Sequence, residues 1–339
     1  MESRNYVEFF EKIGEGIYKC TACPFHCVLK EGMVGYCGVR SVEKGKPRAL
    51  VYGLPVSIAV DPIEKKPLFH FYPGSKVLSL GTLGCNMRCE GCQNWEIAHR
   101  TPSQWNYAFY KIMPEDLPRL MREVDADGVA FTYNEPTVWA EYVYDGAYEV
   151  KKSGGYTVAV TNGYFSEEVR RKWSEVVDAY AIDLKAVFPE TYAKFAPGIK
   201  PEVVMDNIRW LFDQGKHVEV IVNLMPGVND SKDERKAMID FVASVSTDIP
   251  FHITRFFPMF QMKNVPPTPV GEMLQFREEA RSAGLKYVYL GNIRIEGGED
   301  TYCPACGTLL VKRDGFWVSL NKINEGKCTE CGYKIYGVW

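Results

Sequence analysis

The chain has 339 residues, of which 46% are hydrophobic and 24% are charged, a composition that excludes a mostly disordered protein and allows a sizeable core. Its 40 basic and 43 acidic residues give a net charge of -3, so no overall charge favours nucleic acid as a partner. Residues 1–20 contain no signal-peptide core, and no run of about 18 apolar residues occurs, so we expect a cytoplasmic protein.

The first four cysteines are spaced as Cys20-x2-Cys23-Pro-x2-Cys27-x9-Cys37. Clustered cysteines in a chain without an export signal more often bind metal than form disulfides. Four thiolates complete the coordination of either a zinc ion or an iron–sulfur cluster. Zinc would brace the N-terminal segment and a cluster would relay electrons, while reduced cysteines without metal are a third alternative.

A strand is expected at Val77–Thr82, and it leads into Cys85-x3-Cys89-x2-Cys92. Three thiolates on one loop can hold a [4Fe-4S] cluster and leave its fourth iron without a protein ligand. Such an open iron suits the reductive cleavage of S-adenosylmethionine (SAM), whose amino and carboxylate groups can chelate it. The alternatives are a zinc site completed by His99, or inert thiols.

Beyond the central cysteines, short β-branched or aromatic runs alternate with helical stretches, which predicts repeated β/α units around a parallel sheet. The further strands are expected at Gly128–Tyr133, Thr157–Thr161, Ala179–Leu184, His217–Leu224, His252–Phe256 and Tyr287–Gly291. The helices are expected at Pro114–Val124, Pro136–Lys152, Ser166–Val177, Val203–Gln214, Asp233–Val245 and Val270–Ala283. In such folds the catalytic groups lie at the carboxyl ends of the strands.

The last four cysteines form two Cys-x2-Cys pairs, Cys303/Cys306 and Cys328/Cys331, with a hairpin expected between them at Thr308–Lys312 and Phe316–Leu320. This is the pattern of a zinc ribbon with four thiolate ligands. A module of this size depends on its metal for stability. Rubredoxin-like iron is the alternative to zinc.

The segment Gly84–Trp95, which reads Gly-Cys-Asn-Met-Arg-Cys-Glu-Gly-Cys-Gln-Asn-Trp, resembles the cysteine motif of the radical SAM superfamily. With Asp61–Leu68 and Pro73–Ser75 before it, the motif is similar to relatives of pyruvate formate-lyase activating enzyme, and more narrowly to AmmeMemoRadiSam-type radical SAM proteins. The similarity covers almost the whole chain. It implies an α/β fold with a partial (β/α)6 barrel, SAM as cosubstrate and a reductant such as ferredoxin or flavodoxin.

The resemblance also implies SAM contacts at the ends of the strands. Phe131–Pro136 takes the place of the Gly-Gly-Glu motif that meets the SAM amino group, although only the glutamate is kept. The residues carried over are Asn134, Glu135, Thr161, Asn162, Asp183 and Lys185, with Asn223 and His252 for the nucleoside end. Structural roles compete with these assignments, namely a turn at Thr161–Gly163, a rim ion pair of Asp183 with Lys185, and a core position for His252.

Three functions stay open. A 5′-deoxyadenosyl radical could abstract hydrogen from a protein substrate, or the same chemistry could modify RNA or a small molecule, with the ribbon gripping nucleic acid through its charged and aromatic side chains, namely Lys312, Arg313, Lys322, Lys327, Lys334, Phe316 and Trp317. The third is a non-catalytic redox or structural metal protein without affinity for SAM. The resemblance adds Memo-type and AMMECR-type proteins as partners.

The predicted organisation has three parts. An N-terminal Cys-rich extension covers residues 1–74, the partial barrel covers residues 75–298, and the zinc-ribbon-like module covers residues 299–339.

Overall fold

A computed structural model describes residues 7–339, so the first six residues of the predicted extension lie outside the described residues. The chain divides into two compact units. The first combines Met1–Val60 with Val77–Asp178, and the second combines Asp61–Lys76 with Ala179–Trp339. The borders predicted near residues 74 and 298 stay predictions. No helix in the described part of the chain is long and apolar enough to cross a membrane.

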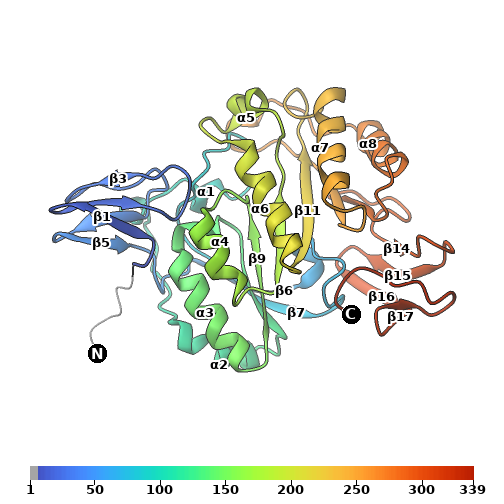
Figure 1. Ribbon diagram of the computed structural model, residues 1–339, viewed down its shortest axis with the longest axis horizontal. Helices are drawn as coiled ribbons and strands as arrows, with labels where there is room; N and C mark the ends of the chain where they lie inside the picture. Colours follow the sequence, from blue (N-terminus) through green and yellow to red (C-terminus); the bar gives the residue numbers. More distant parts are fainter. Residues whose placement is uncertain (1–6) are drawn as a thin grey trace. The chain divides into compact units, whose positions relative to one another are not determined.

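Short antiparallel strands precede the parallel ones in the first unit (Figure 1). One small sheet and one hairpin are made by β1 (Phe10–Gly14), β2 (Ile17–Cys20) and β3 (Val28–Leu29), and by β4 (Arg40–Glu43) and β5 (Lys46–Ala49). They place Cys20 at the end of β2 and Cys37 shortly before β4. The extended β6 (Ser57–Pro62) follows them.

Parallel strands form the rest of the first unit. The strands β7 (Lys76–Gly81), β8 (Gly128–Phe131) and β9 (Tyr156–Thr161) pair in this order. The helices between and after them are α1 (Trp95–Ala98), α2 (Leu117–Glu123), α3 (Ala140–Lys152) and α4 (Glu167–Ser174). Ser166 caps α4 by accepting a hydrogen bond from the Val169 amide at 3.3 Å, as its sequence position predicts.

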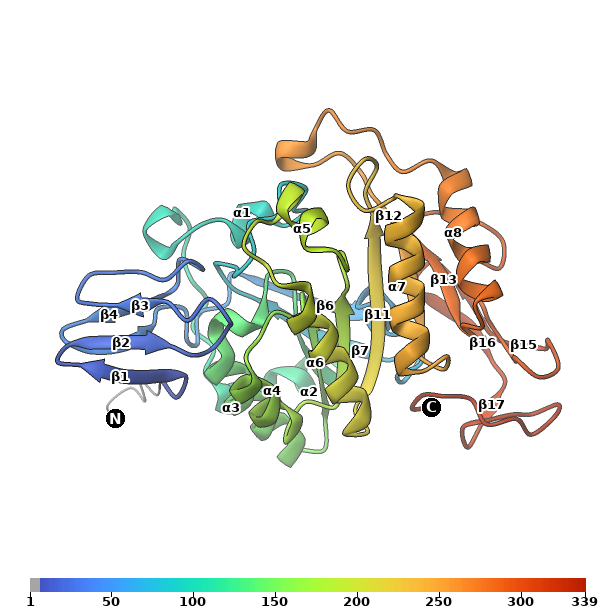
Figure 2. The ribbon, with the colours of Figure 1, turned by 45° about the horizontal axis from the view of Figure 1, so that its top comes forward.

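The second unit continues the same succession of strands and helices. Its strands β10 (Ala179–Asp183), β11 (His217–Leu224), β12 (Phe251–Arg255) and β13 (Val288–Gly291) are parallel neighbours in this order. Its helices are α5 (Pro189–Phe195), α6 (Pro201–Asp213), α7 (Lys232–Val245) and α8 (Val270–Ser282). Figure 2 shows α7 and α8 side by side.

The fold class is confirmed. Each predicted β/α strand is present, and β11 has the bounds that the sequence predicts. Nearly every residue of β7, β8 and β10 is buried, as expected of parallel strands whose two faces are both shielded from water. In each unit the parallel strands form an open row and not a closed ring, as in a partial barrel.

The C-terminal module belongs to the second unit. The predicted hairpin is present as β15 (Leu309–Asp314) and β16 (Trp317–Asn321), and β14 (Thr301–Tyr302) pairs with β15. Two short strands, β17 (Ile323–Asn324) and β18 (Lys327–Cys328), complete the module. Its apolar residues share one buried cluster with side chains from the barrel strand β13 and from the segment before β7.

Candidate active site

The central cysteine loop follows β7 and makes its first turn at Gly84. The φ angle of Gly84 is +83°, and a Cβ atom at this position would lie 2.6 Å from the carbonyl oxygen of Cys37. Only glycine fits such a close approach. The loop then presents three thiols, of Cys85, Cys89 and Cys92, all of them partly buried.

The side-chain amide of Asn134 holds the loop in place. Its Oδ1 accepts from the Thr82 backbone amide at 3.0 Å, and its Nδ2 donates to the Gly84 carbonyl at 2.7 Å. Asn134 is 8% exposed, so these bonds satisfy backbone groups that water does not reach. Asn134, in the segment after β8, therefore fixes the start of the loop that follows β7.

Glu135 ties the end of β8 to the end of β9. Its carboxylate accepts from the Thr137 amide at 3.0 Å and the Thr137 hydroxyl at 2.6 Å, and from the Thr161 hydroxyl and the Asn162 amide, both at 2.7 Å. It caps the turn that begins at Pro136. This glutamate is the one member of the Gly-Gly-Glu pattern that the sequence keeps, and it organises both strand ends.

Asn162 connects the end of β9 to the cysteine loop. Its Nδ2 donates to the Sγ of Cys85 at 3.8 Å and to the Oδ1 of Asn86 at 2.9 Å. Asn86 in turn donates to the Tyr164 carbonyl at 2.7 Å. The structure thus brings together Cys85, Glu135, Thr161 and Asn162, which the resemblance assigns to the cluster and to SAM. Sequence reasoning did not single out Asn86, although its place between two motif cysteines was a signal.

Burial shifts the pKa values of two groups in this cluster, the Cys85 thiol and the Glu135 carboxyl. It raises the pKa of the Cys85 thiol well above its usual range, and the neighbouring Glu135 and Cys89 raise it further. Burial also raises the pKa of the Glu135 carboxyl, while hydrogen bonds from Thr137, Asn162 and Thr161 oppose that shift. A positively charged iron bound to Cys85 would lower the pKa of this thiol, because a thiol that coordinates a metal is deprotonated.

Tyr133 adopts an unusual backbone conformation at the end of β8, with φ +72°. This left-handed conformation is uncommon for a bulky residue and is typical of functional sites. Its carbonyl accepts from the Asn94 side chain at 2.6 Å. Tyr133 stands where the related motif has glycine, so the backbone keeps a glycine-like conformation although the glycine itself is absent.

In the second unit, Asp183 is the last residue of β10, and it forms an ion pair of 2.8 Å with Lys185, which follows the strand. The buried side chain of Asn229, which the sequence did not single out, donates to the carbonyls of Lys185 at 2.8 Å and Asn223 at 2.9 Å. Asn223 lies near the end of β11, and its side-chain oxygen is buried. The strand-end position predicted for these residues is therefore the one observed within this unit.

His252 lies at the opposite, N-terminal end of its strand, β12. Its Nε2 contacts the Glu219 carboxylate at 2.6 Å, and Glu219 is also bound by His217 at 2.9 Å and by the His70 amide at 2.7 Å. Burial alone raises the pKa of Glu219, but the hydrogen bonds from the two histidines hold it well below its usual range. His252 is therefore a buried core residue whose ring is hydrogen-bonded within the protein, which is the structural alternative to a contact with SAM.

The charged segment before β7 is paired within the second unit. Asp61 binds Lys65 and Lys66, each at 2.7 Å, and buried Glu64 lies 3.6 Å from Arg313 of the C-terminal module. Arg313 also donates to the Phe69 carbonyl at 2.7 Å. These contacts give the segment a structural role.

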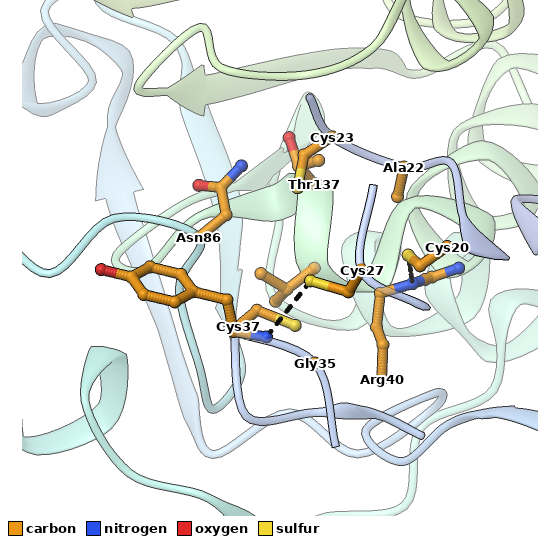
Figure 3. A pocket seen from close by; sticks show the side chains of 11 residues that line it. Cys20, Ala22, Cys23, Cys27, Gly35, Cys37, Arg40, Asn86 and Thr137 are labelled. Atoms are coloured by element: carbon orange, nitrogen blue, oxygen red, sulfur yellow. Dashed lines mark hydrogen bonds between the residues drawn. The ribbon is translucent and has the colours of Figure 1, made fainter. Parts of the chain in front are cut away.

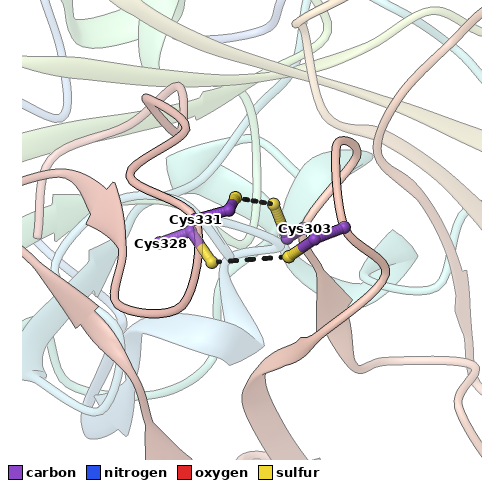
Figure 4. Close-up of side chains that lie close together, drawn as sticks. Cys303, Cys328 and Cys331 are labelled. Carbon is purple, nitrogen blue, oxygen red and sulfur yellow. Dashed lines mark hydrogen bonds between the residues drawn. The ribbon is translucent and has the colours of Figure 1, made fainter.

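The four C-terminal thiols converge as predicted for a metal site (Figure 4). Their sulfur atoms all lie within 4.8 Å of one another, with Cys303 and Cys331 at 3.6 Å and Cys306 and Cys328 at 3.8 Å. A tetrahedral ion with bonds of about 2.3 Å needs sulfurs about 3.8 Å apart. Hydrogen bonding with Thr308 lowers the pKa of Cys306 to about 6, which favours the thiolate that a metal binds.

The four N-terminal thiols line one pocket of the first unit, together with Arg40, Asn86 and other residues (Figure 3). Among residues 7–339, the C-terminal four are the one group of three or more Cys, His, Asp or Glu side chains placed to hold a single metal ion. The central three cysteines with His99 therefore do not form a compact single-ion site. Three spaced thiols on one loop suit the corners of a cluster.

Comparison with known proteins agrees with this geometry. Residues 80–242 match the family model described as the radical SAM superfamily. An uncharacterized protein of Methanocaldococcus jannaschii is 38% identical over 330 residues, which cover 96% of this chain and 97% of that protein. A choline trimethylamine-lyase activating enzyme of Oleidesulfovibrio alaskensis is 26% identical over 132 residues, 39% of this chain and 42% of that enzyme. This chain thus spans less than half of the activating enzyme.

The crystal structure of Streptococcus suis SuiB bound to S-adenosylmethionine has a similar fold, with a TM-score of 0.50 and 12% sequence identity. The match covers 68% of this chain and 53% of SuiB.

Proposed function

Because the chain belongs to the radical SAM superfamily, we propose that it cleaves SAM reductively at a [4Fe-4S] cluster held by Cys85, Cys89 and Cys92. The 5′-deoxyadenosyl radical then abstracts hydrogen from a substrate, which we propose to be a protein. One observation carries the proposal: the Asn162 side chain donates to Cys85 Sγ while its backbone amide donates to Glu135. The thiol loop is thereby fixed to the two strand ends expected to meet SAM.

The bound cluster would supply the single electron that breaks the bond between sulfur and the 5′ carbon of SAM. The residues of this chain orient and shield the reactants. Asn134 fixes the loop, and the left-handed Tyr133 together with Glu135 shapes the backbone that we expect to meet the SAM amino group. Within the second unit, Asp183 pairs with Lys185 at 2.8 Å. The resemblance alone assigns these two residues to the ribose hydroxyls and the carboxylate of SAM, and Asn223 to its nucleoside end.

We further propose zinc for the C-terminal four thiols, because their sulfur spacing matches a single tetrahedral ion. The electron for the central site would come from a low-potential protein such as ferredoxin or flavodoxin. A protein substrate is supported by the likeness to an activating enzyme, and Memo-type and AMMECR-type proteins are the first substrates to test.

The test is anaerobic reconstitution with iron and sulfide, followed by reduction, addition of SAM and quantification of 5′-deoxyadenosine. The matched variant is Cys85→Ala/Cys89→Ala/Cys92→Ala, which should form none. A reconstituted wild type that neither binds nor cleaves SAM would overturn the proposal. Deuterium transfer from labelled candidate proteins into 5′-deoxyadenosine would identify the substrate class, and transfer only from RNA or a small molecule would refute the protein assignment.

A further inference from the structure

The four N-terminal thiols line one pocket but, among the described residues, are not grouped as a single-ion site in the way the four C-terminal thiols are. Cys20 and Cys37 are buried, and Cys23 and Cys27 are partly buried, and all four line the same pocket (Figure 3). Among residues 7–339, however, no three of these sulfurs form a group that could hold a single ion, as the four C-terminal sulfurs do. A tetrahedral zinc ion would hold four sulfurs about 3.8 Å apart. In a [4Fe-4S] cube each cysteine binds a different iron, so the four thiolate sulfurs are held further apart.

Two of the sulfurs already accept hydrogen bonds from the protein. Arg40 Nε donates to Cys20 Sγ at 3.1 Å, and the Tyr36 amide donates to Cys27 Sγ at 3.5 Å. Arg40 is itself held by two 2.8 Å bonds to Glu141, and both side chains are 2% exposed. Hydrogen bonds to ligand sulfurs and buried charge are the features by which proteins set the reduction potential of iron–sulfur clusters.

The pocket adjoins the central cysteine loop within the same unit. Asn86, which follows Cys85, lines the pocket and accepts the hydrogen bond of Asn162, the residue that also donates to Cys85. The backbone of Gly84 packs so closely on Cys37 that an added Cβ atom would lie 2.6 Å from the Cys37 carbonyl oxygen. Each of these contacts joins one cysteine group to the other through a few packed atoms.

A further bridge runs through Tyr36 and Arg88. The Arg88 guanidinium donates to the Tyr36 carbonyl at 2.6 Å and lies 5.4 Å from the centre of its ring. Arg88 stands between Cys85 and Cys89 in the central motif, and Tyr36 stands beside Cys37. Short, densely packed connections of this kind favour electron transfer between two centres.

We infer that the N-terminal cysteines hold a second [4Fe-4S] cluster that passes electrons to the central cysteine loop. The inference rests on the proposed function, because the relay needs a central cluster as acceptor. A flavin or iron–sulfur protein donor loses one electron, the central site gains it for SAM cleavage, and no bond forms or breaks along the relay.

The first experiment measures iron, sulfide and zinc in the anaerobically reconstituted full chain and records its electron paramagnetic resonance spectrum. The variant Cys85→Ala/Cys89→Ala/Cys92→Ala should keep one [4Fe-4S] cluster and its four irons. The variant Cys23→Ala/Cys27→Ala should lose that second cluster, and Cys306→Ala/Cys331→Ala, a matched change at another four-cysteine site, should keep it. A central-loop variant that holds zinc and no iron in the N-terminal site would overturn the inference.

The second experiment tests the relay with flavodoxin and dithionite as alternative reductants. Relative to wild type, Cys23→Ala/Cys27→Ala should form 5′-deoxyadenosine several-fold more slowly with flavodoxin, and at an unchanged rate with dithionite, which reaches the central site directly. The dithionite rate and SAM binding show that the variant is folded. Equal rates with flavodoxin would refute the relay. Failure of the proposed function looks different, because then wild type would not cleave SAM although the second cluster is present.

Discussion

At the scale of single residues, two buried asparagines form hydrogen bonds with backbone groups at different strand ends. Asn134 satisfies backbone groups of Thr82 and Gly84 in the first unit, and Asn229 satisfies those of Met225, Lys185 and Asn223 in the second. Removing either side chain leaves buried partners unpaired, which costs about 1–3 kcal/mol. The two asparagines differ in the loop that each one holds: Asn134 holds the loop with Cys85, and Asn229 holds the segments with Lys185 and Asn223.

We expect Asn134→Ala to lower the iron content of the central site, because it releases the turn before Cys85. Asn229→Ala should leave that iron in place and weaken SAM binding, because it releases Lys185 and Asn223. Iron analysis, SAM titration and urea unfolding distinguish the two variants. Equal losses of iron in variants of equal stability would contradict this division of roles.

His70 is expected to make the protein sensitive to acid. Its Nδ1 donates to the Tyr336 carbonyl at 2.6 Å, and its Nε2 accepts from the Tyr289 hydroxyl at 2.6 Å. Burial lowers its pKa from 6.5 to about 3, although Glu219 opposes the shift. Below pH 6.5 the unfolded chain therefore binds a proton that the folded chain does not, so stability falls as the pH falls from about 6.5 to about 3.

The expected slope for this one group approaches about 1.4 kcal/mol per pH unit. Glu219, with its lowered pKa, adds a loss in the same direction at lower pH, below its ordinary value of 4.5. Urea unfolding at a series of pH values measures the slope, and His70→Gln should flatten it between about pH 6.5 and 4.5. An unchanged slope in this variant would show that other groups cause the acid sensitivity.

At the scale of elements, the β/α succession could be predicted because each parallel strand is a short apolar run followed by an amphipathic stretch with recognisable caps. Ser166 and Gly154 behave as their sequence positions predict. The short strands β1 to β5 were not predicted, because segments of two to five residues carry too little periodicity. The seven-residue α5 was missed for the same reason.

The turn from β7 into the cysteine loop depends on Gly84, and a matched pair of variants can test this. Gly84 and Gly154 have nearly the same φ angles, +83° and +85°. A Cβ atom at Gly84 meets the Cys37 carbonyl at 2.6 Å, whereas none of the neighbouring atoms lies within 4 Å of one at Gly154. Gly154→Ala should therefore carry only the backbone strain of about 1–2 kcal/mol.

Gly84→Ala should carry the same strain and about 1–3 kcal/mol more from overpacking. It should also weaken metal binding at both cysteine groups of the first unit, because the two segments can no longer approach. Denaturant unfolding and iron analysis report these effects. A Gly84→Ala protein as stable and as iron-rich as Gly154→Ala would show that the close approach is not needed.

At the scale of the whole molecule, sequence reasoning identified the cysteine groups but not the polar networks that join distant segments. Arg40 binds Glu141 across 101 residues, and Arg313 binds Phe69 across 244 residues. Such pairs leave no local pattern, because each arginine looks like an ordinary surface charge until the fold buries it.

The C-terminal module does not pack as a separate body, so its metal should stabilise the second unit as a whole. Cys303 and Cys328 share a buried cluster with Phe69 and Tyr289, and a structural zinc ion contributes on the order of 10 kcal/mol to small domains. We expect Cys306→Ser/Cys331→Ser to lose the metal and, at about 2–4 °C per kcal/mol for a unit of this size, to lower the thermal midpoint of the full chain by tens of degrees.

The control for this prediction is Trp317→Ala, because Trp317 lies in the same module, is 78% exposed and is not a metal ligand; its midpoint should match that of wild type. Calorimetry of the cysteine variant should show that the module and the second unit unfold in one transition, because Arg313 and Glu64 are buried together. A separate early transition, with the remaining transition at the wild-type temperature, would mean that the module is energetically independent and that the shared cluster does not couple it to the barrel strands.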